Sequence, residues 1–354
     1  MIRNLSAVFC LILFSSVHAA QKSFYYFDGS DHDGRYVLEQ NFIGSLEDKH
    51  EKLKEDPFFD SEGKAEYLQK NTQKIVLDPE DSERTQSFLV KRRESNKRIV
   101  IVVPPLKGKQ ERMAHIAALF PDCDILFPPC YFAQRGILKT CVPSWFDGAA
   151  HSAVTIPSSY AVRAHDWARK AYTEVVALGV CFGACLVADA QRQLQEREQA
   201  QSFDRIILDS MPSTYHDVVN NWVQDPTGVQ SGGAQTSSDW WKWFASVSLV
   251  KGTASVISYY GLPEVSFLKS TQQLECPVLF IHGTDDASVT NEQFNQLYGS
   301  VPHFKKYALV TPHRHMRHCK NSPGLYYEFV QRFMDKPIDE LGECGVGSLL
   351  TQGE

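Results

Sequence analysis

Three groups of side chains in this chain of 354 residues have the types and spacing needed for nucleophilic chemistry. Cys181 lies between Gly179 and Gly183. Two aspartates occupy 285–286, and the stretch 313–318 holds three histidines. A thiol is only partly ionised at neutral pH, so it needs a neighbouring base, and a carboxylate holds that base in one tautomer. These groups therefore predict attack by Cys181 on an acyl carbon, assisted by an imidazole and a carboxylate.

The sequence around Cys181 predicts a strand, a sharp turn and a helix. The apolar run from Val175 to Val180 is short enough for a buried parallel strand. After the turn, apolar residues are spaced for the inner face of a helix, namely Ala184, Leu186, Val187 and Ala190. The flanking glycines would let strand and helix pack closely around a strained residue, and a helix N-terminus favours the reactive thiolate. The alternative is an inert core cysteine.

The pattern Gly179-Val180-Cys181-Phe182-Gly183 resembles the nucleophile elbow of the α/β-hydrolase superfamily, which is usually G-x-S-x-G. The cysteine version is similar to the dienelactone hydrolase branch. The resemblance implies an α/β-hydrolase fold, in which a mostly parallel central sheet is flanked by helices and carries a helical cap insertion. It also implies that the acid and the histidine follow the nucleophile in that order along the chain.

The resemblance extends to the acid and the histidine. The segment 283–286 follows an apolar run and matches the family's G-x-x-D pattern, which puts the acid at Asp286. Asp285 is the alternative, and both aspartates can also be turn formers. His315 aligns with the family's catalytic histidine, but residues 312–314 replace the usual small residues, so His313 and His318 stay open.

An acyl-transfer site also needs two N–H donors for the oxyanion. The resemblance implies that one is the main-chain N–H of Phe182, directly after the nucleophile. The other would come from the loop after the apolar run 98–103, where the family often has His-Gly. Prolines stand at 104–105 and have no N–H, so Leu106 or Lys107 is the expected donor.

The remaining apolar runs predict the elements of such a fold. We expect a hairpin over 72–92, strands at 98–103, 124–127, 205–209, 277–282 and 305–310, and helices at 113–120, 160–172 and 325–334. The stretch 211–275 interrupts this alternation and is the expected cap insertion. It contains Trp240, Trp241 and Trp243, which we assign to substrate binding; ordinary packing and docking to a membrane surface are the alternatives.

The first residues and the net charge bear on localisation, domain organisation and partners. Residues 1–19 have the pattern of a signal peptide, with Arg3 before a short apolar run, so we expect a secreted or periplasmic protein. We expect an N-terminal extension at 20–71, the hydrolase domain at 72–334 and a loosely ordered tail at 335–354. The net charge of −6 argues against a nucleic-acid partner.

Together, the residues and the resemblance imply a secreted hydrolase that cleaves an ester, thioester or lactone of a small molecule. It would act through a Cys181 acyl-enzyme and need neither cofactor nor metal. Acyl transfer by the same residues and a binding protein with an inert Cys181 are the alternatives. Two weaker interpretations are a papain-like site at Cys185, from a partial C-G-[SA]-C-[WY] match, and a metal site at the three histidines.

Overall fold

The structure is a computed structural model that describes residues 25–28, 35–38, 46–62, 64–78, 86–105, 110–129, 152–197, 201–214, 267–302, 306–335 and 350–352. The expected signal peptide and most of the expected cap, including its three tryptophans, lie outside the described residues. The expected oxyanion donors Leu106 and Lys107 lie outside them as well.

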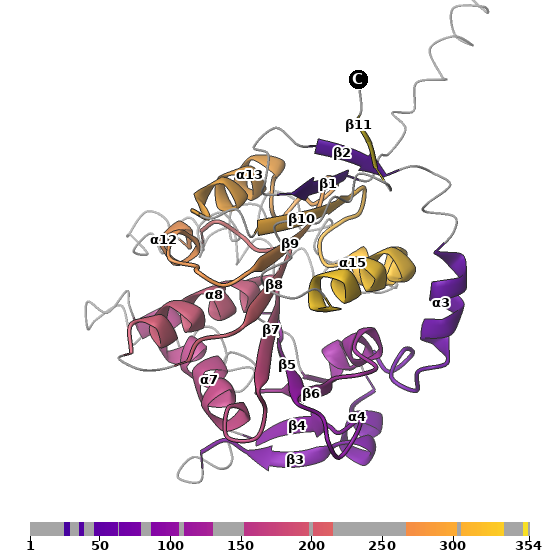
Figure 1. Cartoon of the computed structure of the whole chain (residues 1–354), viewed down its shortest axis with the longest axis vertical. Coiled ribbons are helices and arrows are strands. Elements are labelled where there is room, and N and C mark those ends of the chain that lie inside the picture. Colours follow the sequence, from indigo (N-terminus) through magenta and orange to yellow (C-terminus); the bar gives the residue numbers. More distant parts are fainter. Residues whose placement is uncertain are drawn as a thin grey trace, which may run out of the picture.

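A twisted sheet runs through the centre of the molecule, with helices on both of its faces (Figure 1). Its main strands are β3 (Gln73–Val76), β4 (Gln86–Val90), β5 (Arg98–Val103), β6 (Asp124–Phe127), β7 (Glu174–Val180), β8 (Arg205–Asp209), β9 (Val278–Gly283) and β10 (Lys306–Thr311). In space they follow the order β10-β9-β8-β7-β5-β6-β4-β3. The neighbours from β10 to β6 are parallel, and the hairpin β3–β4 adds an antiparallel edge. The hairpin and the expected strands are therefore confirmed.

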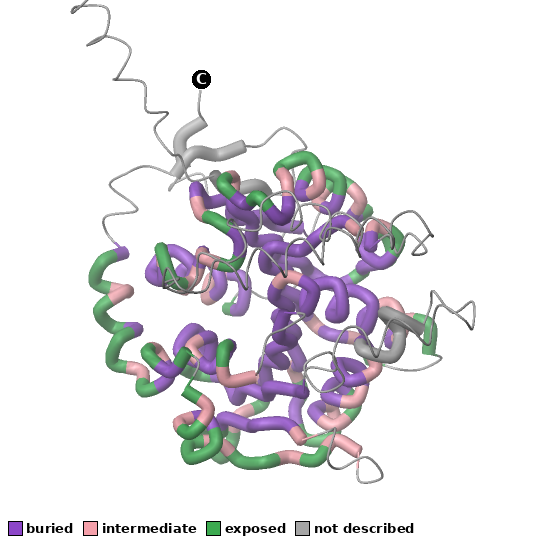
Figure 2. Tube along the Cα trace, turned by 180° about the vertical axis from the view of Figure 1, so that it is seen from behind, coloured by how far each residue is buried: buried purple, intermediate pink, exposed green. Residues whose placement is uncertain are grey.

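The central strands are continuous apolar runs because helices cover both of their faces. In β5, Ile99 and Ile101 pack into one core, whereas Val100 and Val102 pack into the other. The first core is covered by α7 (Ser152–Ala168), α8 (Phe182–Gln195) and α13 (Asn291–Ser300), and the second by α4 (Ala65–Asn71), η2 (Gln110–Leu119) and α15 (Pro323–Asp335). Figure 2 shows the buried strands between these two helical layers.

Three further strands extend the sheet beyond β10. They are β1 (Tyr25–Asp28), β2 (Arg35–Leu38) and β11 (Leu350–Gln352), and each is antiparallel to its neighbour. They come from the expected N-terminal extension and the expected tail. The sequence did not predict this pairing, because short strands that join segments so far apart leave no local pattern.

Several helices differ from expectation. The segment expected as a helix at 113–120 is the 3₁₀ helix η2, and α7 begins eight residues before the expected 160. We did not predict α13 or three short helices: α4, α12 (Leu268–Gln272) and α14 (His318–Asn321). The charged run 47–55, expected as a solvent-exposed helix, is α3 (Glu47–Lys54). The start of α13 carries a recognisable signal, because Thr290 and Gln293 form a capping box.

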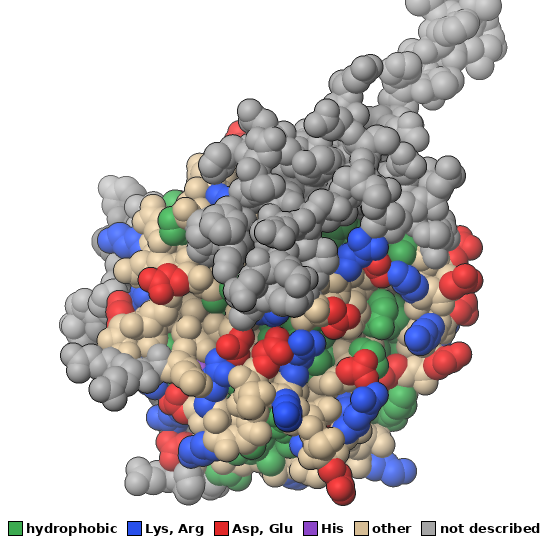
Figure 3. Space-filling view, in the orientation of Figure 1, with side chains coloured by type: hydrophobic (Ala, Val, Ile, Leu, Met, Phe, Trp, Pro, Cys, Tyr) green, Lys and Arg blue, Asp and Glu red, His purple; other side chains and the backbone are tan. Residues whose placement is uncertain are grey.

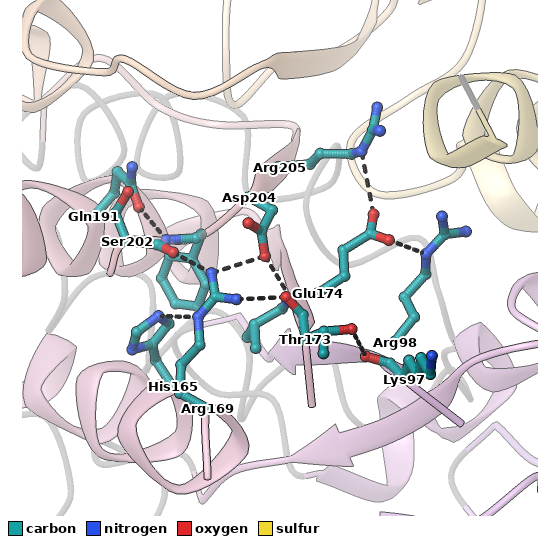
Figure 4. Close-up of polar contacts among 12 residues, drawn as sticks. Lys97, Arg98, His165, Arg169, Thr173, Glu174, Gln191, Ser202, Asp204 and Arg205 are labelled. Carbon is teal, nitrogen blue, oxygen red and sulfur yellow. Dashed lines mark hydrogen bonds and ion pairs between the residues drawn. The ribbon is translucent and has the colours of Figure 1, made fainter. Parts of the chain in front are cut away.

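Charged side chains at the amino ends of the central strands form a network of ion pairs (Figure 4). Glu174, the first residue of β7, contacts the Nε of Arg98 at 2.7 Å and the Nε of Arg205 at 3.3 Å. Arg205 also donates to a main-chain oxygen of α15 at 2.8 Å. Nearby, Arg169 contacts Asp204 at 2.7 Å. This network joins the strand ends to the helices on both faces of the sheet.

The described surface carries charges of both signs. Figure 3 shows lysines and arginines interspersed with aspartates and glutamates over the part of the face that is coloured. Within the described parts of the chain, no helix is long and apolar enough to cross a membrane.

Candidate active site

Cys181 lies at the sharp turn between β7 and α8. Its main chain is in a rare conformation for a residue with a side chain, with φ 55° and ψ −123°. A Cβ at Gly179 would lie 2.4 Å from the Cα of Ala184, and a Cβ at Gly183 would lie 2.3 Å from the main-chain oxygen of Val103. The expectation that the two glycines allow close packing around a strained residue is therefore confirmed.

The side chain of Cys181 is partly exposed, unlike that of Cys185 one helical turn later. Cys185 is fully buried, and its Sγ contacts the main-chain oxygen of Pro212 at 3.6 Å. Burial raises the pKa of the Cys185 thiol well above its ordinary value. The papain-like interpretation of Cys185 is therefore wrong, because a thiol sealed in the core cannot meet a substrate.

Asp286 and His315 meet across two loops that follow neighbouring strands. The Nδ1 of His315 lies 2.7 Å from the Oδ2 of Asp286. The other carboxylate oxygen accepts the main-chain N–H groups of Ser288 at 2.8 Å and Val289 at 2.9 Å. Burial raises the pKa of Asp286, but His315 and these hydrogen bonds outweigh it, so the pKa lies below its ordinary value. Asp285, the alternative acid, is exposed.

The imidazole of His315 connects the carboxylate to the thiol. It is hydrogen-bonded to Asp286, and it also interacts with the thiol of Cys181. Burial lowers the pKa of His315, but the charges and hydrogen bonds of Asp286 and Cys181 raise it well above its ordinary value of 6.5. The structure thus brings together Cys181, His315 and Asp286, each after the carboxyl end of a different parallel strand.

The other two histidines of this stretch have different partners. The Nε2 of His313 lies 2.7 Å from the Oγ of Ser322. His318 is fully buried, and its Nδ1 lies 2.7 Å from the Oγ1 of Thr311. Burial lowers the pKa of His318 to about 4. The three imidazoles thus do not converge on one point, and the described residues contain no cluster of three or more groups that could hold a metal ion.

Phe182 occupies the place expected for an oxyanion donor, at the first position of α8. Its ring is buried and packs edge-on against Phe267, with 5.8 Å between the ring centroids. The close contact of Gly183 with Val103 and Pro104 brings the end of β5 to the start of this helix. The loop that would supply the second donor begins directly after β5, at Pro104.

Sequence reasoning missed a polar pair at the end of β8. The carboxyl of Asp209 is buried, and its pKa is raised to about 6 by burial. The next residue, Ser210, is also buried and has a φ of 54°. A polar pair directly after an apolar parallel strand was a usable signal, because the carboxyl ends of such strands meet at one edge of the sheet.

No protein-family model and no curated protein matches the chain. Two solved structures have similar architecture. An esterase of Pyrococcus furiosus is 15% identical and has a TM-score of 0.52, with 75% of this chain and 91% of that chain covered. A candidate esterase from Staphylococcus aureus is 11% identical and has a TM-score of 0.50, with 88% of this chain and 97% of that chain covered.

A third solved structure, a candidate dienelactone hydrolase from Klebsiella pneumoniae, covers 75% of this chain and 98% of its own. Its identity is 13% and its TM-score is 0.46, which is too low to distinguish one branch of the fold from another. At these identities the comparisons concern the fold alone. Together with the strand order, they show that the chain has the α/β-hydrolase fold.

Proposed function

We propose that this α/β-hydrolase-fold protein is a hydrolase that cleaves an ester, thioester or lactone of a small molecule through an acyl-Cys181 intermediate. The observation that carries the proposal is the position of His315, which is hydrogen-bonded to Asp286 and interacts with the thiol of Cys181. The strained main chain of Cys181 supports it, because such strain is concentrated at functional sites.

The proposed reaction has two halves. The Cys181 thiolate attacks the carbonyl carbon, and the carbonyl electron pair moves to the oxygen. When the carbonyl re-forms, the bond to the leaving group breaks, and His315 gives its proton to the departing oxygen or sulfur. In the second half His315 takes a proton from water, the resulting hydroxide attacks the thioester, and the carboxylic acid leaves as Cys181 is restored.

The electrostatics of the buried pair support these roles. The raised pKa of His315 favours the protonated imidazole, which is the form that can donate to a leaving group. The lowered pKa of Asp286 means that the carboxyl stays ionised opposite it. Asp286 thereby holds His315 in orientation and stabilises the imidazolium.

The proposal also assigns roles to residues outside the described ranges. Leu106 or Lys107 would supply a second N–H beside that of Phe182, and Trp240, Trp241 and Trp243 would contact the substrate. Residues 1–19 would direct the protein to the periplasm or the exterior. Neither a metal nor a cofactor takes part in the proposed steps.

The chain offers a clean labelling experiment, because the structure describes five free cysteines. Burial raises the pKa of four of these thiols. The pKa reaches about 12 for Cys123 and Cys319, and it also lies well above its ordinary value for Cys185 and Cys276. These four stay protonated at neutral pH. Among the described cysteines, iodoacetamide should therefore label Cys181 first, as peptide mapping by mass spectrometry can show.

The activity test is a panel of chromogenic esters of increasing chain length. Wild type should hydrolyse some of them, Cys181→Ala should show only the uncatalysed rate, and the matched control Cys185→Ala should keep activity. Full activity in Cys181→Ala would refute the proposal. A wild type with no fast-reacting thiol and no hydrolysis would favour a binding protein instead.

A further inference from the structure

Asp209 and Ser210, at the end of β8, are hydrogen-bonded to the chain segments next to all three proposed catalytic residues. The main-chain oxygen of Asp209 accepts the N–H of Cys181 at 2.8 Å. The N–H of Ser210 donates to the main-chain oxygen of Ile281 in β9 at 2.8 Å. The Oγ of Ser210 accepts the N–H of Met316, the residue after His315, at 3.3 Å. Two adjacent residues thus join the elbow, the strand before the acid and the histidine loop.

Backbone strain is concentrated at the same place. Among the described residues, the non-glycine residues with positive φ are Cys181 at 55°, Ser210 at 54° and Met316 at 55°. Such conformations persist only where the surrounding contacts enforce them. Here hydrogen bonds connect the three strained residues. Met316 donates its N–H to the hydroxyl of Ser210, and Cys181 donates its N–H to the main-chain oxygen of Asp209, the residue before Ser210.

The hydroxyl of Ser210 has a hydrogen-bond partner for its proton and for each of its two lone pairs. It has one proton to donate and two lone pairs to accept with. The carboxylate of Asp209, at 2.8 Å, takes the proton. One lone pair accepts the N–H of Met316, and the other faces the Nε2 of His318 at 3.1 Å. This assignment places the proton of His318 on Nε2. Its Nδ1 then accepts from the hydroxyl of Thr311 at 2.7 Å, in preference to the longer contact of that hydroxyl with the main-chain oxygen of His282 at 3.5 Å.

These bonds form one directed chain from Thr311 through His318 and Ser210 to Asp209. His318 is neutral in it, since burial lowers its pKa to about 4. The chain ends at a buried carboxyl that also accepts the hydroxyl of Tyr326 at 3.0 Å. A side branch leads from Ser210 to the N–H of Met316, directly after His315.

We propose that Ser210 is a positioning residue of the reaction, whose hydroxyl fixes the main chain next to His315 and so sets the imidazole between Cys181 and Asp286. This inference rests on the proposed function, because it assigns His315 the role of the base. Ser210 itself acts only through that histidine.

The test compares Ser210→Ala and Ser210→Gly with the wild type. Both variants remove the hydroxyl, but glycine also relieves the positive φ, so Ser210→Gly remains informative if Ser210→Ala folds poorly. For the best chromogenic ester we expect kcat to fall roughly tenfold to a hundredfold in both, with KM within about threefold, because a small misplacement of the base suffices for such a loss. The matched control is Ser61→Ala, which deletes a buried hydroxyl bonded to the main-chain oxygen of Phe58 and should keep the wild-type kcat.

The second readout is the titration of the histidines by NMR, which needs no substrate. In wild type the pKa of His315 should lie well above 6.5, and the nitrogen shifts of His318 should show a neutral ring protonated on Nε2. In the Ser210 variants the pKa of His315 should fall towards its ordinary value, because its contacts with Cys181 and Asp286 weaken. A role confined to stability would leave that pKa unchanged in the folded protein.

The two proposals fail in different ways. If wild type cleaves no ester, the proposed function fails, and the titration of His315 still decides whether Ser210 positions it. A folded Ser210→Gly variant with wild-type kcat, or with an unchanged His315 titration, would overturn the inference. The finding of His318 protonated on Nδ1 would overturn the hydrogen-bond chain on which it depends.

Discussion

At the carboxyl ends of β8 and β9, the carboxyls of Asp209 and Asp286 are buried, and positive φ angles occur nearby at Cys181, Ser210 and Met316. At the amino ends of β5, β7 and β8, several arginines are instead paired with carboxylates (Figure 4). Glu174 lies between Arg98 and Arg205 at one end of β7, and Cys181 lies beside His315 just past the other end. The same strand thus connects a fixed ionic network to a site whose groups can change protonation.

The difference follows from the chemistry of the groups. A guanidinium stays charged at every pH the protein meets, so the network at the amino ends holds elements together without exchanging protons. At the carboxyl ends, burial instead raises the pKa of the Asp209 carboxyl to about 6, and the imidazole of His315 lies between a carboxylate and a thiol. Substitutions at the amino ends should therefore change stability, and substitutions at the carboxyl ends should change activity.

The largest effect is expected for Asp286→Asn. An amide keeps the shape of the side chain but no longer stabilises an imidazolium, so kcat should fall by about 10²- to 10⁴-fold in protein that still folds cooperatively. Ester hydrolysis and thermal unfolding on one preparation check this. The matched control is Asp285→Asn, one residue earlier and exposed, which should stay within about twofold of wild type. Equal losses in both variants would contradict the assignment of the acid.

The corresponding substitution at the amino ends of the strands is Glu174→Gln. It removes the carboxylate that faces Arg205, whose side chain is only 4% exposed. Because Glu174 is itself 25% exposed, we expect a loss of about 1–3 kcal/mol in the free energy of unfolding, with kcat unchanged. Urea unfolding and ester kinetics measure the two quantities. A fall in kcat without a loss of stability would break the distinction between the two ends.

The histidines at the carboxyl ends should make stability depend on pH. Burial lowers the pKa of His282 to about 4 from an ordinary 6.5. Between these values the unfolded chain binds the proton and the folded chain does not, so His282 makes the protein less stable as pH falls from 6.5 to 4.

The variant His282→Gln removes this contribution. The free energy of unfolding should then depend on pH less steeply in that window, by about 1.4 kcal/mol per pH unit. The opposing contribution of Asp209, whose pKa is raised to about 6, is present in both proteins and cancels in the comparison. Urea unfolding at several pH values measures the slope, and parallel curves for wild type and variant would rule out this account of His282.

The smallest effect is expected for Thr290→Ala. Thr290 caps α13 just after the loop of Asp286, and its hydroxyl accepts the N–H of Gln293 at 3.3 Å. Loss of the cap should cost about 1 kcal/mol of stability, with kcat within about twofold of wild type and the same pH slope. Thermal unfolding and ester kinetics check this. A large loss of activity would mean that nearness to the site, rather than membership of its hydrogen-bond network, decides the effect.

The local elements could be predicted from the sequence because their patterns are local. The apolar runs of β5, β7 and β9 and the glycines around Cys181 predicted these strands and the elbow. The position of α13 was missed although Thr290 and Gln293 signal its start, because Phe294 and Leu297 are its only buried apolar residues. The pairing of β1 with β10 joins distant segments and leaves no local trace.

The candidate site likewise has a part that could be predicted from the sequence and a part that could not. The pairing of Asp286 with His315 was anticipated through the resemblance, and the geometry separates His315 from His313 and His318 by their partners. The role of Ser210 could not be foreseen, because it depends on three hydrogen bonds and a positive φ that exist only in the folded chain. A serine after a strand carries no such information by itself.

The most direct test of the central claim is to trap the acyl-enzyme. Wild type is mixed with an activated ester, quenched in acid within the first turnover, digested, and mapped by mass spectrometry. We predict the mass of the acyl group on the peptide that contains Cys181, and its absence in Cys181→Ala. An acyl group on another residue, or hydrolysis with no modified peptide at any time, would contradict the account.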